Sequence, residues 1–195
     1  MNVYIDISNT ILETERLILR PWCQEDLDDF FEYASVDGVG QLAGWNPHKS
    51  IEETQTIMNS FIEKKKVFAL QLKDNSKVIG SLGIEPYNEE KYPEFLDLKC
   101  REIGCVLSKE YWGKGLMPEA VNEVIRYLFD YVELDIIFYG HFVSNNQSAR
   151  VSEKCGFKYY SSGTYETHFG TIEDTVKNIL RKEDYDKAEA PPNLE

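Results

Sequence analysis

The sequence predicts one domain of mixed α/β class over residues 1–186. Strand-like runs alternate with segments whose apolar residues recur every three or four positions, and no internal repeat or linker separates them. A chain of 195 residues is long enough for one hydrophobic core and short for two, and its 42% hydrophobic and 28% charged residues are typical of a globular protein. The polar segment 187–195, which carries two prolines, is predicted to be an unfolded tail.

The first third of the chain predicts one strand and two helices. Arg16–Arg20 is strand-like and is followed by a proline, which ends it. Gln24–Ala34 carries apolar residues at the spacing of an amphipathic helix. Ser50 followed by Glu53 forms a capping box and predicts a helix that continues to about Lys65.

The rest of the chain predicts further strands around two more helices. A polar five-residue turn joins the first two of these strands into a hairpin. The strands are expected at Val67–Leu72, Val78–Ile84, Phe95–Leu107, Ile136–Val143, Phe157–Tyr165 and Val176–Leu180. Ser148–Cys155 predicts a short helix. The clearest helix has Pro118 near its start, where a missing N–H does no harm, and a continuous apolar stripe. The stripe consists of Val121, Val124, Ile125, Leu128, Phe129 and Val132.

Two glycines, Gly113 and Gly115, separate the end of a predicted strand from the start of that helix. Glycine lets the backbone approach an anion closely, and the free N–H groups and dipole of a helix N-terminus attract one. A pyrophosphate is therefore the natural ligand, but for the two glycines alone we favour the alternative, a tight turn without a ligand. The turn is not a P-loop, because Lys114 is followed by glycine rather than Ser or Thr. It is not a dinucleotide fingerprint either, because position 118 is proline.

Charge and composition argue against several function classes. The net charge of −13 argues against unaided binding to nucleic-acid phosphates, which requires clustered Lys and Arg. It is compatible with a cationic acceptor such as a polyamine or a basic peptide, but solubility also explains it, and we favour solubility. No run is as long as a membrane span and the N-terminus lacks a signal-peptide pattern, so we expect a cytoplasmic protein that binds neither membrane nor nucleic acid.

The cysteines and histidines predict no metal site and no redox chemistry. They show neither CxxC spacing nor a ligand pattern, so we expect reduced cysteines that pack as small apolar side chains. These residues are Cys23, Cys100, Cys105, Cys155, His48, His141 and His168.

A second informative segment follows the glycine turn by about thirty residues. It reads Asn145-x-x-Ser148-x-Arg150-x-x-Glu153-Lys154-x-Gly156-Phe157. Together with the turn, it resembles the GCN5-related N-acetyltransferase (GNAT) superfamily, and more narrowly the branch of ribosomal-protein N-terminal acetyltransferases (RimJ/RimL-like) and their small-molecule relatives. Further matches in order are Glu13–Pro21, Trp45–Ser50, Glu102–Gly104 and Lys182–Tyr185, so the resemblance covers roughly residues 11 to 186.

The resemblance implies a mixed, mostly antiparallel sheet, flanked by helices, whose fourth and fifth strands splay apart. The pantetheine arm of acetyl-CoA, the acyl donor, would lie in the splay against the backbone of Val106 and Leu107, near Asn145. The pyrophosphate would bind the N–H groups of the turn. The residues of that turn are Trp112, Gly113, Lys114, Gly115, Leu116 and Met117. The family's usual Arg or Gln three residues before the first glycine is Glu110 here, which weakens binding little if backbone groups hold the anion.

Acetyl transfer to an amine needs a base, stabilisation of an oxyanion and a proton for the thiolate. The resemblance implies direct attack of the amine on the thioester, with Glu102 as the base through water. The alternative for Glu102 is a salt bridge at a sheet edge. The wider superfamily has a tyrosine where this chain has Ser152, and the resemblance makes Ser148, or a water it holds, the proton donor instead. For Ser148 and Asn145 the alternative is helix capping.

The acceptor stays open at this point. It could be a protein N-terminus or a small-molecule amine, because loops decide specificity. Trp45, His48 and Tyr87 could line its pocket, although aromatic residues in loops more often serve packing. A catalytically weak sensor that binds acyl-CoA is the alternative function, whereas a nucleotide-phosphate enzyme lacks the motifs it needs. Many relatives look dimeric, so a homodimer is compatible with the resemblance.

Overall fold

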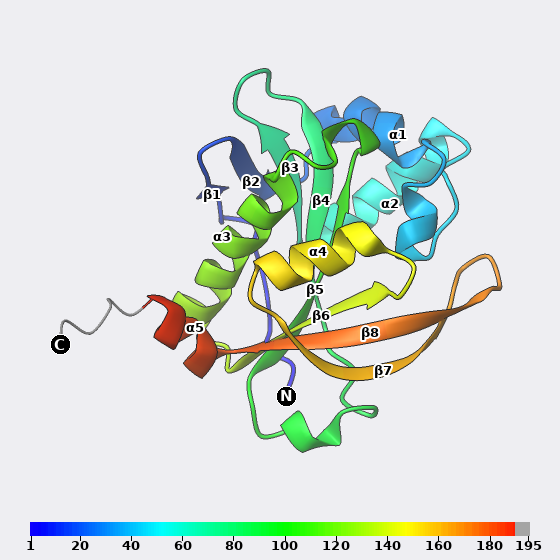
Figure 1. Cartoon of the computed structure of the whole chain (residues 1–195). Helices are drawn as coiled ribbons and strands as arrows, with labels where there is room; N and C mark the ends of the chain where they lie inside the picture. Colours follow the sequence, from blue (N-terminus) through cyan, green and yellow to red (C-terminus); the bar gives the residue numbers. More distant parts are fainter. Residues whose placement is uncertain (190–195) are drawn as a thin grey trace.

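The structure, a computed structural model, describes residues 1–189 as helices packed on one eight-stranded sheet (Figure 1). The order across the sheet is β1-β2-β3-β4-β5-β6-β8-β7. The strands are β1 (Leu12–Glu13), β2 (Leu17–Pro21), β3 (Val67–Leu72), β4 (Val78–Glu85), β5 (Cys100–Leu107), β6 (Ile136–Phe142), β7 (Lys158–Glu166) and β8 (Ile172–Arg181). All neighbouring strands are antiparallel except β5 and β6, which confirms the mixed, mostly antiparallel sheet.

The parallel strands β5 and β6 separate after four residues. Their pairing begins with Cys100 opposite Ile136 and ends with Ile103 opposite Tyr139. Beyond that point β5 continues to Leu107 beside β4 and β6 continues to Phe142 beside β8, so neither strand keeps its partner across the gap. The splay that the resemblance predicts between the family's fourth and fifth strands is therefore present, here between β5 and β6. Tyr139 lies at its vertex.

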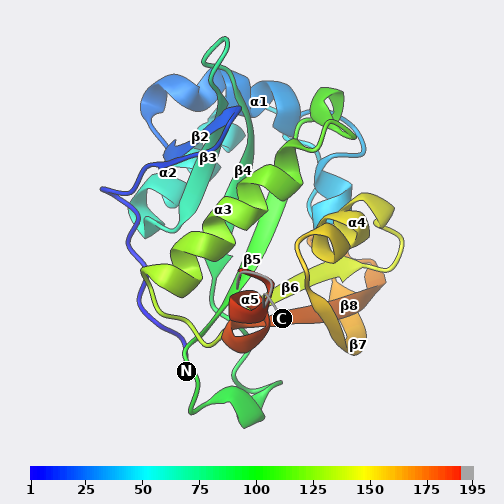
Figure 2. The ribbon, with the colours of Figure 1, turned by 60° about the vertical axis from the view of Figure 1, so that its left-hand side comes forward.

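Helices cover both faces of the sheet (Figure 2). The helices are α1 (Leu27–Ala34), α2 (Ile51–Lys64), α3 (Leu116–Asp130), α4 (Asn146–Lys154) and α5 (Lys182–Glu189). α1 and α2 pack in one apolar cluster on one face, whereas α3 packs in the largest cluster on the other face, beside α4 and α5. The stripe of α3 drives this packing, because Val121, Val124 and Leu128 are fully buried and each contributes about 1.5–3 kcal/mol to stability.

The predicted start of α2 is confirmed with one difference in detail. The Ser50 hydroxyl accepts a hydrogen bond from the Glu53 N–H at 3.3 Å, as a capping box requires. The Glu53 carboxylate, however, accepts from the N–H of Lys49 at 2.7 Å rather than from that of Ser50. The helix ends at Lys64, where Lys65 adopts a left-handed conformation.

Three predicted boundaries differ clearly from the structure, whereas the others differ by small margins. The strand expected from Phe95 begins at Cys100, because Phe95 closes a 3-10 turn (Pro93–Phe95, η3) and packs edge-on against Phe138 at 5.3 Å instead of extending. The last strand is longer than 176–180, since β8 pairs with both β6 and β7. Residues 187–189 belong to α5 rather than to an unfolded tail, and residues 190–195 of that prediction lie outside the described residues. Within residues 1–189, no helix combines the length and the apolar character that crossing a membrane requires.

Candidate active site in the splay

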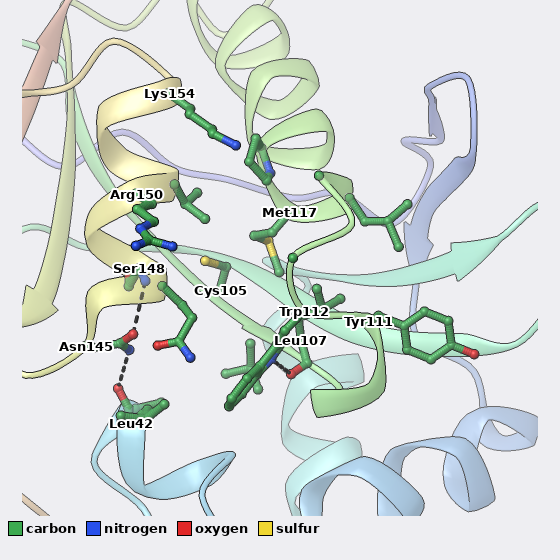
Figure 3. Close-up of a pocket in the computed structure, with 18 of the residues that line it drawn as sticks. Leu42, Cys105, Leu107, Tyr111, Trp112, Met117, Asn145, Ser148, Arg150 and Lys154 are labelled. Atoms are coloured by element: carbon green, nitrogen blue, oxygen red, sulfur yellow. Dashed lines mark hydrogen bonds between the residues drawn. The ribbon is translucent and has the colours of Figure 1, made fainter.

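A cavity of about 260 Å³ lies where β5 and β6 diverge. Its walls come from the outer half of β5, the vertex of β6, the turn before α3 and the first residues of that helix, the length of α4 and the 3-10 turn Gly40–Ala43 (η2) (Figure 3). The cavity gathers most of the residues that the sequence singled out. Those that line it are Val106, Leu107, Trp112, Gly113, Gly115, Leu116, Met117, Asn145 and Ser148. Lys114 and Glu102 do not line it.

The glycine turn has the backbone that an anion site requires. Gly113 and Gly115 have φ values of +76° and +79°, in the left-handed region that only glycine adopts without strain. Gly115 is the N-cap of α3, so the first N–H groups of the helix, from Leu116 onward, have no partner within the helix itself. Lys114 points its ammonium over the Tyr111 ring, 4.8 Å from the centroid, which explains why it misses the cavity.

A side-chain bracket fixes this turn to the edge of the sheet. The carboxylate of Glu119, in the first turn of α3, accepts hydrogen bonds from the N–H of Arg16 at 2.9 Å, from its Nε at 2.7 Å and from the Thr14 hydroxyl. The same Arg16 donates from Nη1 to the carbonyl of Lys114 at 3.0 Å. Arg16 therefore ties the start of α3 and the middle of the glycine turn to one point beside β2.

Replacing Glu119 with glutamine is expected to lower the stability at neutral pH by about 1.5–3 kcal/mol, the typical value of hydrogen bonds to a charged group. Burial raises the pKa of Glu119, but the hydrogen bonds from Thr14 and Arg16 outweigh it and leave the pKa below the ordinary 4.5. Because the folded-state pKa is lowered, the stabilisation is fully present above the unfolded-state pKa. The difference between variant and wild type should therefore persist from pH 7 to about 5 and shrink as the pH falls through the lowered folded-state pKa. Thermal unfolding across this range measures it.

Glu110, an exposed carboxylate in the preceding 3-10 turn (Lys109–Tyr111, η4), provides the matched control for Glu119. Its change to glutamine should leave the unfolding temperature unaltered at every pH. A difference for Glu119→Gln that grew as the pH fell would contradict the bracket.

Two cations of α4 line the open end of the cavity. Arg150 and Lys154 are one helical turn apart and both are exposed, and Lys154 extends from α4 toward α3 (Figure 3). Neither forms an ion pair with any carboxylate of residues 1–188, whose side chains the structure describes. The sequence pattern contained both residues but no role was assigned to them. Their spacing of four on one helix face was the signal that could have identified a second cationic wall opposite the glycine turn.

The backbone of β5 presents alternate residues to the splay. The N–H of Ser108 donates to the carbonyl of Ile79 in the β4 chain at 2.7 Å. Successive residues of an antiparallel strand direct their backbone N–H and C=O groups to opposite sides of the strand. The backbone groups of Val106 therefore also point to β4, whereas those of Cys105 and Leu107 point into the splay. The Leu107 carbonyl already accepts from the Trp112 indole N–H at 2.8 Å (Figure 3). Val106 therefore contributes its side chain to the wall, and not the backbone groups expected from the sequence.

Asn145 caps α4, as the alternative interpretation expected. Its side-chain oxygen accepts from the Ser148 N–H at 3.0 Å, and its amide nitrogen donates to the carbonyl of Leu42 at 3.1 Å (Figure 3). The second bond connects α4 to η2 across the cavity. Ser148 does not cap the helix, because its hydroxyl lies 2.9 Å from the hydroxyl of Tyr139.

The inner end of the cavity is formed by Tyr139, which the sequence did not identify. Tyr139 is 1% exposed, and its hydroxyl lies between the Ser148 oxygen and the Cys105 sulfur, 3.2 Å from the latter. Burial raises the pKa of Tyr139 well above its ordinary value of 10, and burial raises the pKa of Cys105 to about 11. Both groups therefore stay protonated at neutral pH.

Glu102 lies in the still-paired part of β5, opposite Phe138 of β6. Its side chain forms an ion pair with Lys177 of β8, which is the salt bridge considered as its alternative role, although on an interior strand rather than at an edge. Since side chains alternate along a strand, Glu102 and Cys105 lie on opposite faces of the sheet. Gly140 of β6 adjoins the ion pair, where an added methyl group would come within 3.0 Å of both charged groups.

The three aromatic candidates for an acceptor pocket serve packing. Trp45 and His48 pack with their rings tilted and the centroids 5.1 Å apart. Burial lowers the pKa of His48, whose Nδ1 lies 2.8 Å from the Thr54 hydroxyl. Tyr87 is 2% exposed and stacks on Phe138 at 5.1 Å. All four cysteines are free, as expected, and residues 1–189 contain no cluster of three or more side chains that could hold a metal ion.

Comparisons with known proteins agree with this geometry. The model of a family described as the acetyltransferase (GNAT) domain matches residues 16–158. An uncharacterized N-acetyltransferase, YoaA of Bacillus subtilis (strain 168), is 28% identical over 176 residues, which cover 83% of this chain and 96% of that protein.

Two solved structures share the fold. An acetyltransferase (GNAT family) from Bacillus anthracis superposes with a TM-score of 0.76 at 23% identity, covering 89% of this chain and 99% of the other. The ribosomal-protein-S5-alanine acetyltransferase from Vibrio fischeri superposes with a TM-score of 0.71, also at 23% identity, and covers 91% and 99% of the two chains.

Proposed function

The chain belongs to the acetyltransferase (GNAT) family, and from this premise we propose that it transfers the acetyl group of acetyl-CoA to a primary amine. The acceptor is a protein N-terminus or a small-molecule amine, which attacks the thioester directly. The observation that carries the proposal is the difference between the two ends of the cavity in the splay. Its inner end at Tyr139 and Leu107 is buried. Its mouth has two cations, unpaired among residues 1–188, beside a helix N-terminus, which suits a long donor with phosphates at one end.

The phosphates of the donor fit the mouth of the cavity. The N–H groups at the start of α3 and the cations of Arg150 and Lys154 converge there from two helices. The pantetheine arm fits along the splay, where the backbone groups of Cys105 and Leu107 face inward. This placement brings the thioester toward Ser148 at the vertex.

The chemistry needs a base on the acceptor side of the sheet. In this proposal the amine approaches the thioester from the face that carries Glu102, while the donor enters from the face that carries α3 and α4. Glu102, through water, takes a proton from the amine. The amine nitrogen bonds to the thioester carbon, and the C–S bond then breaks with its electron pair on sulfur. Ser148, directly or through a water molecule that it holds, supplies the proton to the thiolate and regains one from solvent.

Replacing Lys154 with alanine is expected to weaken acetyl-CoA binding by roughly 3- to 10-fold, since charge-assisted hydrogen bonds and ion pairs with phosphate at an exposed site contribute about 1 kcal/mol. The loss should shrink as salt is raised, because salt screens exposed charges. Titration calorimetry at two ionic strengths measures it. Lys158→Ala, which removes an equal charge from a residue that does not line the cavity, is the control and should bind as the wild type does.

The experiment that tests the function joins a thermal-shift titration with acetyl-CoA to a free-thiol assay on a panel of amines. Binding to the folded state raises the unfolding temperature in a concentration-dependent way. Thiol release with one class of amine would support the transferase and identify its acceptor. A thermal shift without turnover would favour the acyl-CoA sensor, and no shift at saturating acetyl-CoA would refute the proposal.

A further inference from the structure

Resting on the proposed function, we propose that Tyr139 is a positioning residue that aims the hydroxyl of Ser148 at the sulfur of the departing CoA. The inference begins with the distances at the vertex of the splay. The Tyr139 oxygen is 2.9 Å from the Ser148 oxygen and 3.2 Å from the Cys105 sulfur, and all three residues line the cavity. The serine, from α4, thus meets a tyrosine from β6 and a cysteine from β5.

The protonation of these groups permits a chain of hydrogen bonds that runs from Cys105 through Tyr139 to Ser148. Burial keeps both the Cys105 thiol and the Tyr139 phenol protonated, so each is a donor with one hydrogen. When the thiol donates to the Tyr139 oxygen, the phenol donates to Ser148. The serine oxygen then has its own hydrogen free to point into the cavity. Successive donors polarise one another, so the chain strengthens the last hydrogen bond.

The packing around Tyr139 fixes the phenol in place. Its ring contacts the Phe157 ring, with the centroids 5.2 Å apart, and its backbone is held between Ile103 of β5 and Asn178 of β8. Ser148 is held by the bond from its own N–H to Asn145. Two independently anchored residues thus meet at one short contact. A serine hydroxyl otherwise rotates freely, and this contact selects the rotamer in which it serves the thiolate.

The expected effect of Tyr139→Phe on catalysis is separate from any effect on packing. Tyr139→Phe keeps the ring and its contact with Phe157 and removes only the hydroxyl, so the unfolding temperature should change little. The kcat for acetyl transfer should fall about 10-fold with the KM for acetyl-CoA unchanged. In the complex with CoA, the pKa of the bound thiol should rise by roughly half to one unit, the size of one lost hydrogen bond.

The experiment is a double-mutant cycle on Tyr139→Phe and Ser148→Ala, read both by kcat and by ultraviolet titration of the CoA thiolate on the protein. If Tyr139 acts through Ser148, the double variant should match Ser148→Ala in both measurements. The control is Tyr92→Phe, because Tyr92 is also buried and its hydroxyl lies 3.1 Å from that of Ser161, outside the cavity. It should leave both measurements unchanged.

Three results would overturn the proposal. Tyr139→Phe could leave kcat and the thiol pKa unchanged, its effect could persist undiminished in the Ser148→Ala background, or Tyr92→Phe could reproduce it. If the wild type binds CoA but transfers acetyl to no amine, the proposed function fails, whereas the thiolate titration still decides the role of Tyr139. A wild type that does not bind CoA would refute both.

Discussion

Replacing Glu102 with glutamine is expected to lower kcat for acetyl transfer by about 10²- to 10³-fold, within the range that a general base contributes. The KM for acetyl-CoA should stay unchanged, because Glu102 does not line the donor cavity. Glutamine keeps the shape of the side chain and its space beside Gly140, so the fold should be retained. Steady-state kinetics against each substrate separately, with acetyl-CoA and the amine varied in turn, measure the effect.

The ion pair with Lys177 provides the control, because it is the structural role that Glu102 could play instead. Lys177→Gln breaks the same ion pair and leaves the carboxylate in place, so it should cost less than 10-fold in kcat. If the carboxylate acts only as a salt-bridge partner, the two variants should lose equal stability and equal, small amounts of activity. Equal losses would therefore contradict the role of Glu102 as base.

The local patterns of the sequence were sufficient for most of the helices. The apolar stripe of α3 has Val121, Val124 and Leu128 at three- and four-residue spacing, so only one orientation of the helix buries it. The structure buries all three residues completely. The cap of α2 at Ser50 is equally local. The splay between β5 and β6 came only from the resemblance to a family, because no periodicity in a strand states where its neighbour departs.

Residues whose role depends on tertiary contacts were missed. Tyr139 belongs to an apolar strand pattern, and only the placement of α4 over β6 brings the Ser148 hydroxyl to it. Glu102 and Lys177, which form a salt bridge, are 75 residues apart in sequence. Both lie in strands that were predicted, but the sequence did not predict how these strands are placed relative to each other. Phe95 was assigned to a strand from the alternation of residues 95–107, whereas the aromatic cluster around Phe138 determines its conformation. In each case a long-range contact overrides a local preference.

A second large effect is expected at Gly115. Replacing Gly115 with valine is expected to weaken acetyl-CoA binding by about 10- to 100-fold. A β-branched residue at φ +79° is a genuine outlier that costs roughly 1–3 kcal/mol, and a shift of the turn that relieves the strain moves the N–H groups of Leu116 and Met117 away from the phosphates. The space itself is not the obstacle, since the closest atom to an added methyl group is 3.5 Å away on Arg16.

Two variants separate binding from strain. Gly115→Asn, a residue that tolerates the left-handed region, should bind acetyl-CoA within a few-fold of the wild type. Gly170→Val, at φ +82° in the turn between β7 and β8 and with open space around it, should lose comparable stability but keep the wild-type affinity. Calorimetric titration with acetyl-CoA, beside thermal unfolding of each variant, measures both quantities. If Gly115→Val bound acetyl-CoA as tightly as Gly170→Val, the two glycines would be a tight turn and nothing more, and the phosphates would have to be held by α4 alone.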